Sequence, residues 1–154
     1  MALRKASASD LYERDYYAWV QDQVDALRQR RIKDVDWENV AEEIDDLGKS
    51  EKRALRSQLA RLVEHLLKIE HAPARIRSAN LRAWEVSVRY ARRAVLEMLE
   101  ENPRLKSELK KIFARAYLDG RDQTLGSLKL ADPAIPEIAP WSAEEVIQAN
   151  FRKG

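Results

Sequence analysis

The segment from Asp36 to Ile69 constrains the fold more than any other part of the chain, because its apolar residues keep one helical phase throughout. At 100° per residue they form a single stripe. The stripe contains Trp37, Val40, Ala41, Ile44, Leu47, Leu55, Leu59, Leu62, Leu66 and Ile69. Gly48 lies inside the segment without shifting this phase. The sequence therefore predicts one long helix, roughly 50 Å at 1.5 Å per residue, straight or kinked at Gly48. Asp36 is its expected N-cap, and its apolar stripe is expected to face inward.

The rest of the chain predicts an all-α fold, a helical bundle of four main helices around this long central helix. Only 4 Gly and 5 Pro are present, and no alternating strand pattern occurs. The predicted elements are helices over residues 10–30, 81–101 and 105–128, a Pro-rich strap over 132–140 and a short helix after Ser142. Asp10 is the expected cap of the first helix, and Ile135 and Ile138 are expected to attach the strap. We expect a flexible arm at 1–9, a bundle at 10–131, and a strap and C-terminal helix at 132–154 that pack on the same domain.

Composition and motifs narrow the function only by exclusion. The chain has 28 basic and 26 acidic residues, a net charge of +2, which does not by itself indicate nucleic-acid binding. The absence of cysteine excludes a disulfide and a thiolate nucleophile. No apolar run approaches the roughly 20 residues of a membrane span, so the prediction is a cytoplasmic protein with no membrane partner. No phosphate loop, HExxH, GxSxG or EF-hand pattern occurs, and we expect no cofactor and no metal.

Two groups of polar residues are candidate sites. Glu51, Gln58 and His65 recur seven apart along one margin of the apolar stripe. They predict either solvent-exposed edge positions or a polar seam that forms a small binding site. Arg82, Arg89 and Arg93 lie together on one face of the 81–101 helix. They predict either solvated and paired charges or an anion-binding face that contacts phosphates.

Three functions remain open at this point. Long amphipathic helices and segregated charge favour an interaction or scaffold module that binds itself or a protein partner. The arginine face favours a nucleic-acid-associated protein. A carboxylate-rich, metal-dependent hydrolase is the third alternative, and the residues it uses are Glu43, Glu51 and His65 together with Asp119 or Asp122.

The order of several motifs also resembles a known family. These motifs are Tyr12 to Trp19, Asp36 to Ile44, Leu47 to Glu51, His65 to Lys68, Trp84 with Arg92 and Arg93, and Pro140 to Ser142 followed by Phe151. In this order they resemble the bacterial family named domain of unknown function 29, over nearly the whole chain from Tyr12 to Phe151. The resemblance implies a compact helical fold with no established activity and no known catalytic residue.

Overall fold

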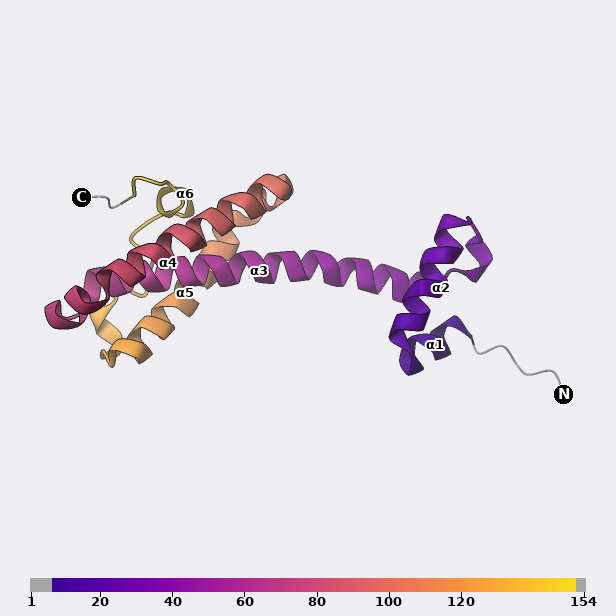
Figure 1. Ribbon diagram of the computed structural model, residues 1–154, viewed down its shortest axis with the longest axis horizontal. Helices are drawn as coiled ribbons and strands as arrows, with labels where there is room; N and C mark the ends of the chain where they lie inside the picture. Colours follow the sequence, from indigo (N-terminus) through magenta and orange to yellow (C-terminus); the bar gives the residue numbers. More distant parts are fainter. Residues whose placement is uncertain (1–6, 152–154) are drawn as a thin grey trace. The chain divides into compact units, whose positions relative to one another are not determined.

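The computed structural model describes residues 7–151, and within this range the chain consists of helices and connecting segments without a β-strand (Figure 1). The predicted all-α fold is confirmed. The α-helices are α1 (Ala8–Arg14), α2 (Tyr16–Arg28), α3 (Trp37–His71), α4 (Ala74–Glu101), α5 (Leu109–Leu128) and α6 (Ala143–Val146). Short 3-10 turns occur at Ile32–Asp34, Pro103–Glu108 and Asp132–Ala134. The chain divides into two compact units, residues 1–50 and 51–154, and each is described separately below.

The predicted long helix is confirmed as α3, which runs without interruption from Trp37 to His71. The backbone N–H of Asn39 donates to Asp36 Oδ1 at 3.5 Å, consistent with Asp36 as the N-cap. Gly48 lies inside the helix, and a Cβ added there would meet nothing within 4 Å. The glycine is therefore accommodated as an ordinary, exposed helical position.

The prediction of one helix over residues 10–30 is wrong, because the chain breaks at Asp15 into α1 and α2. Asp15 leaves the helical region at φ −148° and ψ 81°, and its side chain caps α2 by accepting from the Ala18 N–H at 3.0 Å. The N-terminal helix also begins earlier than predicted. Ser7 is its N-cap, and Ser7 and Asp10 form a reciprocal capping box. Residues 7–9 thus form the N-cap and the first helical positions of α1, and residues 1–6 of the predicted arm lie outside the described residues.

Polar tips of aromatic side chains hold the N-terminal unit together. The hydroxyls of Tyr12 and Tyr16 both donate to the Glu43 carboxylate at 2.7 Å. Trp19 is buried, and its indole N–H donates to Asp36 at 3.2 Å. Gln23, also buried, accepts from the backbone N–H of Asp36 at 2.7 Å. These bonds attach α1 and α2 to the first turns of α3.

The C-terminal unit contains the main hydrophobic core. The second half of α3 buries Leu55, Leu59, Leu62, Val63, Leu66 and Leu67 in one cluster with residues of α4, α5 and α6. Gly120 on α5 fits closely against α3, because a Cβ placed there would lie 2.7 Å from the carbonyl oxygen of Ala60 and 2.8 Å from Val63 Cγ1. The Thr124 hydroxyl lies 2.8 Å from the Gly120 carbonyl oxygen of its own helix and 3.2 Å from the Glu64 carbonyl oxygen across the same contact. A residue without a side chain thus sets the distance between α3 and α5.

The prediction of an inward-facing stripe is wrong for the first half of α3. Trp37 is 56% exposed, Ile44 63% and Leu47 68%. The stripe is buried only from Leu55 onward, where α4 and α5 contribute to the same core cluster. A hydrophobic phase shows which face of a helix is apolar, but burial also requires neighbouring elements that cover that face.

Two further boundaries and one contact differ from the sequence predictions. Helix α4 begins at Ala74 rather than at residue 81, because Pro73 stands at the N-cap and the exposed first turns need no apolar pattern. A 3-10 turn at Pro103–Glu108 precedes α5, which starts at Leu109 rather than at residue 105. Ile138 is 84% exposed and does not attach the strap.

The strap is held instead by buried groups of α5. Ile135 is 1% exposed, and the buried Arg121 guanidinium donates to the carbonyl oxygens of Asp132, Ile135 and Pro136. The Tyr117 hydroxyl donates to the Pro136 carbonyl oxygen at 2.7 Å. The predicted capping box of Ser142 and Glu145 is confirmed, and it starts the short helix α6.

Candidate functional site

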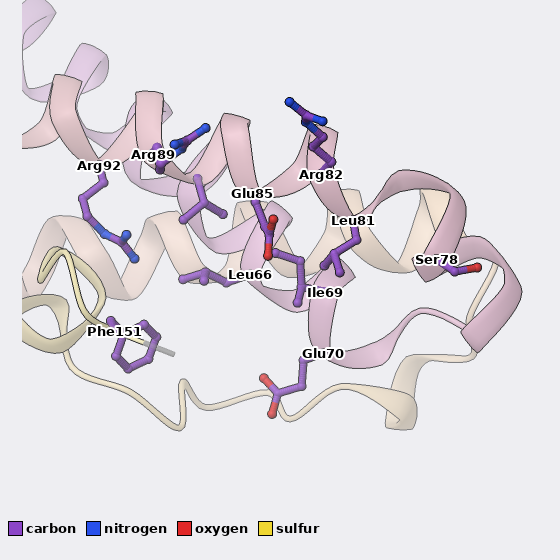
Figure 2. A pocket seen from close by; sticks show the side chains of 11 residues that line it. Leu66, Ile69, Glu70, Ser78, Leu81, Arg82, Glu85, Arg89, Arg92 and Phe151 are labelled. Atoms are coloured by element: carbon purple, nitrogen blue, oxygen red, sulfur yellow. The ribbon is translucent and has the colours of Figure 1, made fainter. Parts of the chain in front are cut away.

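A cavity of about 720 Å³ lies in the C-terminal unit, between the end of α3, the first half of α4 and Phe151 (Figure 2). Its apolar lining consists of Leu66, Ile69, Leu81, Val88 and Phe151. Its polar lining consists of Glu70, Ser78, Arg82, Glu85, Arg89 and Arg92. The volume is in the range of pockets that hold small molecules, about 300–1,000 Å³.

Arg92 is the most unusual residue of this cavity, because it is a cation with only 6% of its surface exposed. Its Nε donates to the backbone carbonyl oxygen of Val146 at 2.9 Å, which ties α4 to α6. One terminal nitrogen, Nη2, is buried and has no hydrogen-bond partner within residues 7–151. Burial lowers the pKa of the Arg92 guanidinium. Figure 2 shows this guanidinium extending from α4 toward Phe151.

The other charged groups lie nearer to solvent. Arg82, Glu85 and Arg89 are exposed along α4. In Figure 2 the Glu85 carboxylate lies on the Ile69 side of α4, whereas the Arg82 and Arg89 guanidinium groups extend away from Phe151. The cavity therefore combines one buried guanidinium, an apolar wall and a charged, hydrated rim.

The structure separates the three arginines that the sequence placed on one candidate face. Arg82 and Arg89 line the cavity, whereas Arg93 does not. Arg93 is instead an exposed residue in an ion pair with Glu97 at 2.8 Å. Arg92, one position before it, was not predicted as a site residue, because its burial beside α6 is not visible in the helical pattern of α4. The proposal of an anion-binding face thus remains for Arg82, Arg89 and Arg93, with Arg92 as an added, buried member of the same helix.

The predicted polar seam shows no convergence in the part of the chain that the structure describes. Glu51 is exposed, and Gln58 and His65 are half-buried. His65 Nδ1 lies 2.9 Å from the Arg61 carbonyl oxygen of its own helix. None of the three lines the cavity beside Arg92. A binding role for Glu51, Gln58 and His65 stays a prediction.

A second, smaller hollow of about 290 Å³ lies between α3 and α5 and is lined mainly by basic residues. It is lined by Lys52, Arg53, Arg56, Glu108, Lys111, Ile112 and Arg115. Lys52 pairs with Glu108 at 2.8 Å, and Arg56 makes two bonds to Asp119 at 2.6 and 2.8 Å. The sequence does not indicate this hollow, because its basic residues come from two helices that are distant in the chain.

The exposed face of α3 in the N-terminal unit is a third candidate surface. Trp37, Ile44 and Leu47 project from one side of the helix and are each more than half exposed. Isolated apolar residues on a surface need no explanation, but three on one helical face form a continuous strip. This strip is suited to contact another helix.

The fold and these surfaces define an all-α protein with a long helix shared by two compact units and a cavity beside a buried arginine. The chain belongs to the family described as Domain of unknown function DUF29, whose sequence model matches residues 11–152. The resemblance of the motifs from Tyr12 to Phe151 is thereby confirmed. No curated protein and no solved structure matches the chain. Among the described residues, no helix is both long enough and apolar enough to cross a membrane.

Proposed function

We propose that this protein is a helical interaction module that pairs with a second copy of itself through the exposed face of α3. The observation that carries this proposal is the exposure of Trp37, Ile44 and Leu47 on one side of a continuous helix. Long helices expose such faces when they pair with another helix, because the contact buries apolar surface that water otherwise covers.

The charges on either side of Gly48 favour a second copy in antiparallel orientation. Residues 38–46 contain five acidic side chains and no basic one. Residues 49–56 contain four basic side chains and only Glu51 as an acid. Two parallel copies would place like blocks together, whereas two antiparallel copies place the acidic block of each against the basic block of the other. This arrangement centres the pair on about residue 47, beside the exposed Leu47.

Sedimentation equilibrium over a range of protein concentrations tests the pairing. Full burial of an Ile or Leu side chain stabilises by about 1.5–3 kcal/mol. A two-fold pair contains each substitution twice, so Ile44→Asp and Leu47→Asp should each weaken dimerisation by about two to four orders of magnitude. Leu96→Asp is the matched control, since Leu96 is 45% exposed on α4, outside the N-terminal unit. A wild-type monomer at every concentration contradicts the proposal.

The basic hollow supports a second candidate, nucleic-acid binding. Lys52, Arg53, Arg56, Lys111 and Arg115 converge there, although two of them already form ion pairs. Binding of a short duplex should fall steeply as salt rises, because each phosphate contact releases a counterion. The double variant Lys111→Gln and Arg115→Gln should reduce that salt dependence. Absent or salt-independent binding rejects this candidate.

The metal-dependent hydrolase has less support. Asp119 is engaged by Arg56, and Glu43 accepts bonds from two tyrosines. Within residues 7–151 no group of three or more His, Asp or Glu side chains could hold a metal ion. We therefore put forward no catalytic step for Glu43, Glu51, His65, Asp119 or Asp122.

A further inference from the structure

We propose that the cavity beside Arg92 is a binding site for a small amphipathic carboxylate, whose head group pairs with Arg92 and whose apolar body lies against Leu66, Ile69 and Leu81. The site lies within the C-terminal unit and does not depend on pairing through the N-terminal unit. The sequence pattern indicated only Arg82 and Arg89 of its lining, because the rest comes from α3, other positions of α4 and the segment after α6.

The buried guanidinium determines the charge of the ligand. A cation removed from water is costly unless a counter-charge or hydrogen-bond acceptors replace the lost hydration. Arg92 makes one bond to the Val146 carbonyl oxygen, and its buried Nη2 is left without a partner within the described residues. A carboxylate in the cavity supplies the opposite charge, and it also supplies an acceptor once the Arg92 side chain rotates far enough to present Nη2.

The apolar lining determines the rest of the ligand. Leu66, Ile69, Leu81, Val88 and Phe151 provide a wall that an inorganic anion cannot use. Phe151 is held by an edge-to-face contact with Trp141, with ring centroids 5.8 Å apart. Burial of aliphatic or aromatic surface against this wall contributes favourable free energy that phosphate alone does not gain. A monocarboxylate with an apolar tail satisfies both parts of the site.

The rim determines how the ligand enters. Arg82 and Arg89 supply positive charge near the opening, and Glu85 opposes it. Glu85 is exposed, so water weakens the repulsion between its carboxylate and an anion in the cavity but does not remove it. Removal of that negative charge should therefore tighten carboxylate binding modestly, whereas it would weaken the binding of a cation.

Isothermal titration calorimetry with decanoate at pH 8, below its micelle concentration, tests the inference on the full chain. Decyltrimethylammonium replaces the negative head with a positive one, decanol has no charge, and inorganic phosphate has no tail. We expect saturable binding of decanoate, at least tenfold weaker binding of each of the other three, and tighter decanoate binding by Glu85→Gln. Failure of decanoate to bind, or equal binding of the ammonium compound or of phosphate, overturns the proposal.

Two matched variants locate the site. Arg92→Gln should weaken decanoate binding by about ten- to one-hundredfold, the effect of losing a charged hydrogen bond. Arg93→Gln changes the neighbouring exposed arginine, which does not line the cavity, and should leave binding unchanged. Leu81→Trp fills the cavity without removing the Arg92–Val146 bond and should also abolish binding. If Arg92→Gln melts at the wild-type temperature and binds decanoate equally well, the proposal is wrong. If it does not fold, unchanged binding by Leu81→Trp overturns the proposal.

Discussion

Replacement of Gly120 by alanine should destabilise the C-terminal unit, whereas the same replacement at Gly126 should stabilise it. Both glycines lie within α5, so both variants gain helix propensity, about 1 kcal/mol for alanine over glycine. They differ in their surroundings. A Cβ at Gly126 meets nothing within 4 Å, but a Cβ at Gly120 lies 2.7 Å from a backbone oxygen of α3.

The cost at Gly120 comes from groups that cannot rotate away. Relief of the contact with Ala60 O requires α5 to move away from α3, and Val63 Cγ1 at 2.8 Å resists the same substitution. Overpacking of this kind costs about 1–3 kcal/mol. The two variants should therefore differ in unfolding free energy by about 1–3 kcal/mol.

Urea unfolding followed by circular dichroism measures this difference. The gain in helix propensity from glycine to alanine is common to both variants, so it cancels when their unfolding midpoints are compared. Gly126→Ala should raise the unfolding midpoint, and Gly120→Ala should lower it relative to Gly126→Ala. Equal midpoints for the two variants refute the assignment of Gly120 as the contact that sets the distance between α3 and α5.

Three further predictions concern other parts of the molecule. Glu43 raises the pKa of Tyr12 to about 12 through its hydrogen bond, so stabilisation by a neutral Tyr12 should persist at pH 10 and disappear as pH rises through about 12. The two tyrosine hydroxyls lower the pKa of Glu43, so its contribution is present above the usual carboxyl pKa and is lost as pH falls through the lowered value. Ultraviolet titration should show the high Tyr12 pKa in the wild type and a value near 10 in Glu43→Gln. Arg121→Met should release the strap, because several hydrogen bonds of a buried guanidinium are lost. Protease should then cleave after residue 131 faster than in Arg115→Met, which changes an exposed arginine on the same helix. Gly48→Ala should raise thermal stability by about 1 kcal/mol, and a decrease would show that the glycine has a contact or a bend that α3 does not display.

The sequence predicted the elements of the fold well where local chemistry decides them. The phase of the apolar stripe predicted α3 through Gly48, and Ser142 with Glu145 predicted the start of α6. The break at Asp15 was missed because Asp15 interrupts no apolar position, although an aspartate can end one helix and cap the next. Local pattern thus predicts which segments are helical better than it predicts where one helix stops.

The candidate site was only partly predictable, because its properties arise between elements. Arg82 and Arg89 share a helical face and were found from the sequence, but Arg92 becomes unusual only through its burial beside Val146. The exposure of Ile44 and Leu47 was also not predictable from their phase, which is the same as that of the buried Leu55. Which part of an apolar stripe is covered depends on the contacts between helices, and single-sequence periodicity does not contain that information.

Cysteine cross-linking at position 47 tests the proposed pairing of two copies through α3 most directly, because the chain has no native cysteine to compete. Leu47→Cys is compared with Leu96→Cys, using a short bismaleimide at the same protein concentration. If the two copies pair antiparallel around residue 47, Leu47→Cys gives a covalent dimer in high yield and Leu96→Cys stays monomeric. If both variants stay monomeric, or both cross-link to the same extent, the exposed face of α3 is not where two copies meet.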